Sequence, residues 1–344
     1  MTGSVHTEGL SKRLYDALAN DYPDHRDDRR PVHAVGIGAV GYFEPSMVAS
    51  DYTIAEHFQG GRIPATVRFS NGSGSPVERD HDLDVRGMAT KFHLPSGADT
   101  DLIMITLSVF FASTTDEFLG FSEAGVPKPV KAESWWGKLR DMLRLRAPAS
   151  PPEADNPESG AAGVLAYANR HLSVRPGTVA ALLLVTPNSY ARATYHALHT
   201  FKLTAPDGSV HYARFHWEAV AGVHPVAKAT HSPDFLHAEL RHRLAREPAR
   251  FVLRMVLAGQ GDPIDNPTVL WDTTRPRIVM GELVLTAMVP DQHEDCERLS
   301  FNPTRVVAGF ECSDDPILAA RRGAYEYSCR KRQGSGCPVG GDQW

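Results

Sequence analysis

Apolar residues recur at helical spacing near the start of the chain. Leucines at every fourth position from Leu10 to Leu18 predict an amphipathic helix over residues 1–20. The charged, proline-containing stretch that follows predicts a loop or arm over residues 21–30. Near the other end of the chain, a proline in the first turn indicates the start of a long helix over residues 315–331.

Between these ends, the pattern of strands dominates. Runs rich in valine, isoleucine and aromatic residues are bounded by clusters of glycine, serine, asparagine and proline. The dipeptide Asp207-Gly208 predicts a tight hairpin between two of the strands. The predicted strands cover residues 32–43, 66–69, 88–94, 102–111, 179–185, 194–203, 211–218 and 278–289. The predicted shorter helices cover residues 55–58, 116–123, 134–146, 158–171 and 232–258, the last of them interrupted near Pro248.

The many hairpin signals favour an antiparallel barrel over a parallel sheet. The chain has 344 residues, a length that gives a prior of about two domains, although one barrel can account for most of it. We therefore predict an α+β fold with a mainly β core in residues 28–332, preceded by a helix and arm in residues 1–27. The glycine-rich stretch 333–344 is predicted to be a flexible tail.

Charge and composition exclude several classes of protein. The chain has 36 Lys and Arg against 41 Asp and Glu, a net charge of −5, so it has no basic excess to bind nucleic acid as its main partner. Its 42% apolar and 22% charged residues are typical of a globular protein. No apolar run approaches the roughly 20 residues of a membrane span. No apolar segment typical of a secretory signal begins the chain, and we expect a cytoplasmic protein.

The cysteines support the same location. All four, Cys296, Cys312, Cys329 and Cys337, lie in the last fifth of the chain, and none forms a C-x-x-C pair. A disulfide framework of a secreted protein would be spread more evenly. The distribution therefore favours free thiols in a reducing compartment.

A histidine and two arginines interrupt apolar strand patterns. His33 follows Arg30-Pro-Val and precedes a glycine-rich run; alone, such a histidine is more often a core residue than a catalyst. The glycines would let a flat or bulky group approach the strand. Arg68 and Arg86 are costly to bury unless they are paired. Either aspartates nearby in the sequence pair with them, or they bind a buried anion such as a carboxylate.

The helix predicted near the end of the chain carries a tyrosine beside a cation. Arg321, Tyr325, Cys329 and Arg332 fall on one helical face, with Arg321 one turn before Tyr325. A cation at that spacing favours the phenolate form of the tyrosine. A phenolate is a hard, anionic ligand suited to ferric iron. The alternative is an exposed helix with a cation–aromatic stack.

Together and in this order, these motifs resemble the haem catalase family, in particular its short, catalase-related peroxidase type. R-x-V-H-A with the following G-x-G-x-x-G-Y-F-E resembles the strand of the distal histidine, and V-R-F-S and V-R-G-x-A-x-K-F resemble the next two strands. D-L-x(6)-V-F-F resembles the distal phenylalanine segment, H-T-F-K and Y-A-R-F-H a later hairpin, and R-x-x-A-Y the proximal helix. The resemblance covers residues 28–120, 190–220 and 275–332.

The resemblance implies an eight-stranded antiparallel β-barrel with helical additions that holds a buried haem b in residues 28–332. Tyrosine is the haem ligand of catalases; Tyr325 matches it as the axial ligand of the iron, with Arg321 supporting its phenolate. His33 matches the distal acid–base residue, and Ser70 matches the residue that orients it. The other matches are the propionate-binding arginines and the apolar residues of the distal pocket: Arg30, Arg68 and Arg332, and Val32, Phe110 and Phe118.

The sequence departs from catalases at one distal position. Ile105, with Thr106 beside it, stands where the family carries an asparagine. A hydrogen-bond donor aimed at the reacting atom is worth about 3 kcal/mol in such a site, so dismutation of hydrogen peroxide is expected to be weak. The short frame predicts a more open pocket and a homodimer rather than a tetramer. Cys329 stands where the family has a histidine.

We therefore expect a haem-dependent peroxidase that reduces organic hydroperoxides, and hydrogen peroxide, with a small electron donor. Its partners would be these small molecules, with neither nucleic acid nor a membrane span. One alternative is a fatty-acid hydroperoxide isomerase or dehydratase that resembles allene oxide synthases, although Val32 stands where those enzymes carry a threonine. A second alternative is a non-enzymatic haem-binding redox sensor.

Overall fold

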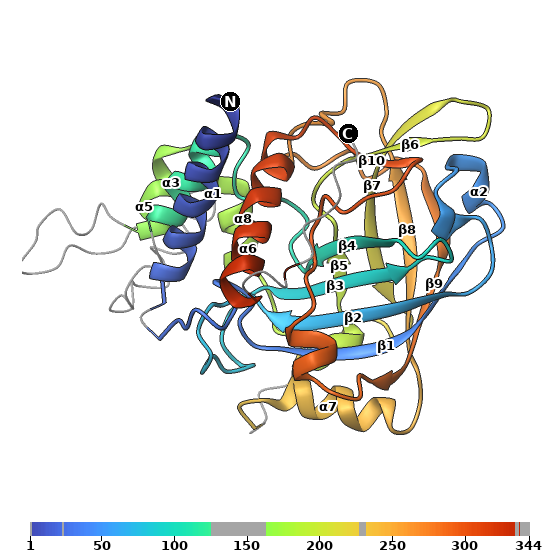
Figure 1. Ribbon diagram of the computed structural model, residues 1–344, viewed down its shortest axis with the longest axis horizontal. Coiled ribbons are helices and arrows are strands. Elements are labelled where there is room, and N and C mark those ends of the chain that lie inside the picture. The colour runs from blue at the N-terminus through green and yellow to red at the C-terminus, as the bar shows by residue number, and fades with distance from the viewer. Residues whose placement is uncertain (1, 23, 125–162, 227–231, 334–336, 338–344) are drawn as a thin grey trace, which may run out of the picture.

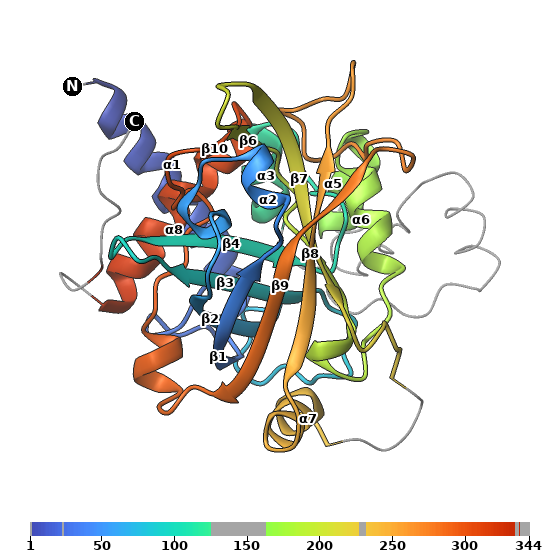
Figure 2. The same cartoon turned by 90° about the vertical axis from the view of Figure 1, so that its right-hand side faces the viewer.

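Ten strands in the described part of the chain form one antiparallel sheet, and eight of them close into a barrel (Figures 1 and 2). The computed structural model describes residues 2–22, 24–124, 163–226, 232–333 and 337. The strands are β1 Gly36–Pro45, β2 Ile63–Asn71, β3 Arg86–His93, β4 Asp99–Ile105, β5 Thr194–His196, β6 Phe201–Thr204, β7 Val210–Ala219, β8 Ala249–Leu257, β9 Arg277–Met288 and β10 Phe310–Cys312.

The ring runs in the order β7-β5-β4-β3-β2-β1-β9-β8, and pairing of β7 with β8 closes it. Strands β6 and β10 extend the sheet beside β7. The predicted eight-stranded antiparallel barrel is therefore confirmed. Closure leaves the ring strands without free edges, which protects their backbone groups.

The helices gather outside the barrel. Figure 1 shows α1 beside α8 and α3 at one side of the barrel, with α7 beneath it. The helices are α1 Thr2–Asn20, α2 Ala49–Tyr52, α3 Thr115–Glu123, α5 Gly163–Arg170, α6 Arg175–Leu182, α7 Phe235–Leu244 and α8 Pro316–Gln333. Three shorter turns are η1 Glu56–Phe58, η3 Tyr190–Arg192 and the π-helical η4 His293–Glu297. None of the helices in the described ranges is long and apolar enough to cross a membrane.

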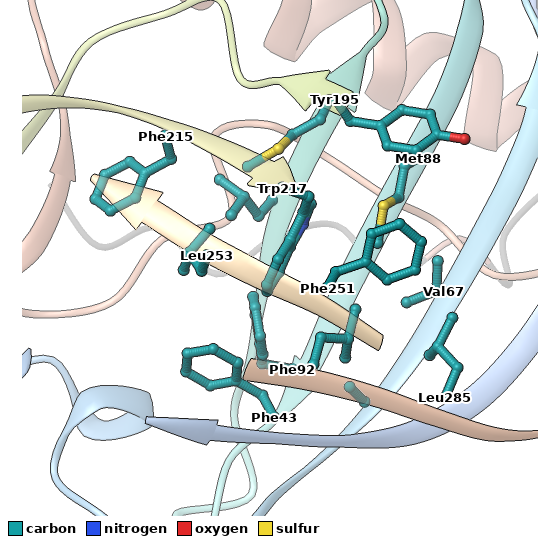
Figure 3. Packing of buried hydrophobic residues seen from close by; sticks show 14 of the residues in the cluster. Phe43, Val67, Met88, Phe92, Tyr195, Phe215, Trp217, Phe251, Leu253 and Leu285 are labelled. Atoms are coloured by element: carbon teal, nitrogen blue, oxygen red, sulfur yellow. The ribbon is translucent and has the colours of Figure 1, made fainter. Parts of the chain in front are cut away.

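Large apolar side chains fill the interior of the barrel (Figure 3). The ring of Phe43 lies 5.3 Å from that of Phe92 and 6.0 Å from that of Trp217, measured between centroids, and both contacts are edge-to-face. The residues that Figure 3 labels are Phe43, Val67, Met88, Phe92, Tyr195, Phe215, Trp217, Phe251, Leu253 and Leu285. Because side chains occupy this space, a large cofactor has to bind outside the barrel.

A second apolar cluster lies between the barrel and the helices. It joins Leu14 of α1, Phe118 of α3 and Ile317 of α8 to Phe110 and Leu198. Helix α8 begins as the sequence predicts, with Pro316 as its first residue. The backbone N–H of Ile317 donates to Oδ1 of Asp315 over 2.8 Å. The cluster fixes the helix that carries the predicted tyrosine against the outside of the barrel.

Several of the predicted elements are wrong. The strand predicted over residues 194–203 is two strands, because β5 ends at His196 and β6 begins at Phe201. Residues 179–185, predicted as a strand, belong mostly to α6, which has Pro176 in its first turn. Leu182, its last residue, and Leu183 face solvent. Residues 232–258, predicted as helix, contain α7 and then β8, which pairs with both β7 and β9. Its buried positions alternate because only one face of the strand points into the barrel. Strand β4 ends at Ile105 rather than at residue 111. The predicted helix 134–146 lies outside the described residues.

The cysteines also differ from the prediction of free thiols. Cys329 at the end of α8 forms a disulfide with Cys337. Cys296 and Cys312 are free. The pairing was not visible in the sequence because the two partners are separated by eight positions and do not form a recognised spacing pattern. The cytoplasmic location and the homodimer stay predictions, as do the domain bounds.

A buried histidine gives the fold a pH dependence. His57 is 2% exposed and packs against Phe58, Phe92 and Phe310, with no partner for its Nδ1 in the described residues. Burial lowers the pKa of His57 to about 3. Below about pH 6.5 the imidazole of His57 therefore binds a proton in the unfolded chain but stays neutral in the folded chain. Stability from this group is complete above pH 6.5 and is lost as the pH falls toward 3.

Replacing His57→Phe should remove this loss. Between pH 8 and pH 5, the free energy of unfolding of the wild type should fall by roughly 2 kcal/mol more than that of the variant. Urea unfolding at both pH values measures the difference. The control His293→Phe changes a side chain that is 74% exposed and should leave the pH dependence as it is. Equal losses in His57→Phe and wild type would contradict the prediction.

Candidate active site

The predicted distal pair, His33 and Ser70, is in contact on the outside of the barrel. Nδ1 of His33 lies 3.0 Å from Oγ of Ser70, which is a residue of β2. Gly87 of β3 makes this contact possible, because a Cβ there would lie 2.7 Å from Oγ of Ser70 and 3.0 Å from Nδ1 of His33. The hydrogen bond fixes the plane of the imidazole ring.

The backbone of His33 is strained. Its φ of +58° lies in the left-handed region, which non-glycine residues rarely adopt. The strand predicted from residue 32 therefore starts only at Gly36. Two hydrogen bonds hold the strained residue: its N–H donates to the carbonyl of Gly72 over 2.9 Å, and Nη2 of Arg68 donates to its carbonyl over 3.0 Å. Such strain is common where a site needs one fixed geometry.

The electrostatic environment keeps the His33 ring neutral. Burial and the charge of Arg68 lower the pKa of His33 to about 3, and Arg321 and Arg30 act in the same direction. A neutral imidazole at neutral pH can accept a proton and return it. His33 therefore has the protonation state that a distal base requires.

An apolar residue occupies the position at which catalases carry the distal asparagine. Ile105, the last residue of β4, is paired with Gly87 and so lies across from the distal pair. Thr106 is turned to the backbone, since its Oγ1 accepts the N–H of Arg86 over 3.0 Å. Ile105 offers no hydrogen bond to a molecule beside His33.

A buried chain of hydrogen bonds ends at Tyr325. Oδ2 of Asp315 lies 2.6 Å from Nδ1 of His199, and Nε2 of His199 lies 2.7 Å from Nη1 of Arg321. Nη2 of Arg321 then donates to the hydroxyl of Tyr325 over 3.0 Å. Asp315 and His199 each have a side chain only 1% exposed. A proton on Nδ1 satisfies the whole chain, because Nε2 is then free to accept from the arginine.

The motifs had not assigned a role to His199 or Asp315. His199 stands in the H-T-F-K motif, and Asp315 directly precedes the proline that begins α8. An acid at a helix start predicts a cap, and Asp315 does accept from Ile317. Its second oxygen, which bonds His199, had no local signal because the two residues are 116 positions apart.

Three predicted arginines meet at one residue that the sequence had not indicated, two of them at its carboxylate and one at its backbone carbonyl. Nη1 of Arg30 lies 2.6 Å from Oε2 of Glu297, and Nε and Nη2 of Arg68 lie 3.0 and 2.9 Å from its Oε1. Nη1 of Arg332 donates to the backbone carbonyl of Glu297 over 2.9 Å. The other arginine that was singled out, Arg86, is paired with Asp84 at 3.5 Å, as the ion-pair interpretation expected.

The predicted apolar residues lie in the second cluster or beside the distal histidine. The rings of Phe110 and Phe118 are 5.4 Å apart and perpendicular. Cζ of Arg321 lies 5.8 Å from the ring of Phe110, so the aromatic cluster reaches the hydrogen-bonded chain of α8. Val32 is half-buried directly before His33. The structure thus gathers the predicted residues around one region between the barrel and α8.

Comparison with known proteins places the chain in a family. The family model described as Catalase matches residues 14–142 and 171–337. This chain belongs to the catalase family. Among similar curated proteins, a catalase-related peroxidase of Mycolicibacterium paratuberculosis is 33% identical over 89% of this chain and 89% of its own length. A catalase-related peroxidase of Synechococcus elongatus is 27% identical over 88% of this chain and 83% of its own length.

Catalase structures share the fold. A fungal catalase and catalase A from Saccharomyces cerevisiae both match with a TM-score of 0.69, at 23% and 22% identity. They cover 92% and 91% of this chain, which spans 61% and 63% of theirs. Catalases generally bind haem. The catalase-related peroxidases among the relatives indicate an oxidoreductase that acts on peroxide.

Proposed function

We propose that this catalase-family chain is a haem b peroxidase. It reduces organic hydroperoxides, and hydrogen peroxide, with electrons from a small reductant, and it dismutates hydrogen peroxide only weakly. The proposal depends on one observation: two polar groups lie on the two sides of the region between the barrel and α8. Neutral His33 is bonded to Ser70 on the barrel, and Tyr325 ends the hydrogen-bonded chain on α8.

The residues present fit a haem. Tyr325 offers a phenol oxygen to the iron, and Arg321 donates a charge-assisted hydrogen bond to that oxygen. Nε of Arg332 is buried and has no partner in the described residues, as expected for a group that meets a propionate. The proposed propionate partners are Arg30, Arg68 and Arg332, and the proposed apolar contacts are Val32, Phe110 and Phe118. When bound, the haem supplies the redox chemistry.

The residues of the chain then move one proton and hold one charge. Nε2 of His33 faces away from Ser70 and is the atom that takes the proton from the near oxygen of a peroxide. It returns this proton to the far oxygen, so that water or an alcohol leaves instead of hydroxide or alkoxide. Arg321 balances the phenolate of Tyr325, and the bond from His199 fixes the guanidinium in place.

Ile105 supports the peroxidase over a catalase. Dismutation requires a second hydrogen peroxide to be oriented as the reductant, and a donor beside the distal histidine would orient it. Ile105 cannot donate, and Thr106 is turned toward the N–H of Arg86. A different reductant, which needs no such donor, is then the more effective source of electrons.

Two substitutions separate the two sides of the site. Tyr325→Phe should lose most of its haem, because the iron loses its anionic ligand. His33→Ala should keep its haem, but its reaction with peroxide should slow by about 10²–10⁴-fold. Haem content, the ferric absorption spectrum and stopped-flow mixing with an alkyl hydroperoxide measure these effects. Tyr327→Phe, on the same helix, is the control and should bind haem normally.

Either of two results would remove a residue from the proposed site. Full peroxidase activity in His33→Ala would exclude it as the distal base. A normal ferric spectrum in Tyr325→Phe would exclude it as the ligand.

Restoring a donor should restore dismutation. Ile105→Asn should release oxygen from hydrogen peroxide at least about tenfold faster than the wild type, since one donor in such a site is worth about 3 kcal/mol. An oxygen electrode measures the rate. Ile103→Asn, two residues earlier on β4, is the matched control and should change nothing. No gain in Ile105→Asn would mean that this position does not limit dismutation.

A further inference from the structure

The arginines of the proposed propionate site share one residue of the short helix η4. We call Arg30, Arg68 and Arg332 the arginine clamp. They come from the arm before β1, from β2 and from the end of α8, and all three bond to Glu297. Segments up to 267 positions apart therefore meet at the last residue of η4.

Without Glu297 the clamp would contain only like charges. Burial and the charge of Arg68 lower the pKa of Arg30 to about 9 and that of Arg332 to about 10. Glu297 acts against this on both arginines. Burial alone would raise the pKa of Glu297, but the charges of Arg68 and Arg30 hold it below its usual range. The carboxylate is therefore ionised and is the anion that keeps the guanidinium groups together.

We propose that Glu297 is the positioning residue of the arginine clamp. It fixes the orientation of the arginines, so that their charges face the two carboxylates of a haem. This inference rests on the proposed haem function. The charges agree with it: three guanidinium groups and one carboxylate leave a net charge of +2, which two ionised propionates neutralise. A buried cluster with balanced charge avoids the large cost of an unpaired buried ion.

The contact between Glu297 and Arg68 also connects the clamp to His33 on the distal side. Nη2 of Arg68 bonds both to Glu297 and to the carbonyl of His33. Gly36 leaves room for this guanidinium, because a Cβ there would lie 2.3 Å from Cζ of Arg68. Glu297 thus acts on the strained backbone of His33 through Arg68, and it fixes the clamp relative to the distal base.

The test compares haem with its dimethyl ester, in which both propionates have lost their charge. Haem-free wild type should bind haem more tightly than the ester. Glu297→Gln should bind haem at least about tenfold more weakly, because the loss of the charge-assisted hydrogen bonds to Arg30 and Arg68 disorders the clamp. Its affinity for the ester should change less than about threefold, because the ester has no propionate charge for the clamp to bind. Absorption titration of the full chain measures both affinities.

One control variant and several contrary results complete the test. Glu294→Gln on the same turn alters a side chain that is 53% exposed and should bind both compounds as the wild type does. Equal losses for haem and ester, or no loss for haem, would overturn the positioning role. Tighter haem binding by Glu297→Gln would show that Glu297 competes with the propionates, which also overturns it. A wild type that binds no haem would instead refute the proposed function.

A second variant covers the case that Glu297→Gln does not fold. Glu297→Asp keeps the charge but withdraws it by one methylene group. It should lose part of the preference for haem over the ester, while its melting temperature shows that it folds. An unchanged preference in this variant would contradict the proposal.

Discussion

The structure depends on the need to pair every charge that is buried between the barrel wall and α8. Apolar side chains fill the interior of the barrel, so the chemistry lies on its outer surface, where helices exclude water. Burying an ion there is costly unless an opposite charge and hydrogen bonds compensate it. Two networks reduce this cost: the first balances its charges, and the second leaves a net charge of +2 for the proposed propionates. One runs from Asp315 to Tyr325, and the other joins the arginine clamp to Glu297.

These networks connect the fold to the proposed reaction. Helix α8 contributes a residue to each of them, Arg321 to the first and Arg332 to the second. The helix cannot shift against the barrel without breaking both. Arg68 joins the second network to the backbone of His33. The proposed distal base and the proposed iron ligand are therefore held in one rigid frame, as a reaction that needs a fixed distance between them requires.

Much of the fold could be predicted from local patterns. Alternating apolar positions and turn residues predicted a strand at every ring strand except β8, although the predictions for β1 and β4 were too long and β5 and β6 were predicted as one strand. The hairpin at Asp207-Gly208 is present between β6 and β7. The failures have a common cause. Short apolar runs such as residues 179–185 suit a helix or a strand equally well. Only pairing with β7 and β9 makes residues 249–257 a strand.

The candidate site also consists of residues that local motifs predicted and residues that they did not. His33, Ser70 and Tyr325 belong to recognisable motifs, whereas Glu297 and Asp315 belong to none. Glu297 and Asp315 act on partners more than a hundred positions away, at separations of 229 and 116. Their role follows from charges that the fold brings together, which no local spacing encodes. The disulfide between Cys329 and Cys337 escaped prediction because a spacing of eight positions is not a recognised pattern.

The most direct test of the account is to mix the haem-loaded wild type with peroxide, with and without a reducing dye. The account predicts a ferric high-spin Soret band that weakens on addition of an alkyl hydroperoxide or hydrogen peroxide. The band should return only as the dye is oxidised, with little oxygen released. Rapid oxygen release from hydrogen peroxide without dye would contradict it, because the chain would then be an efficient catalase despite Ile105.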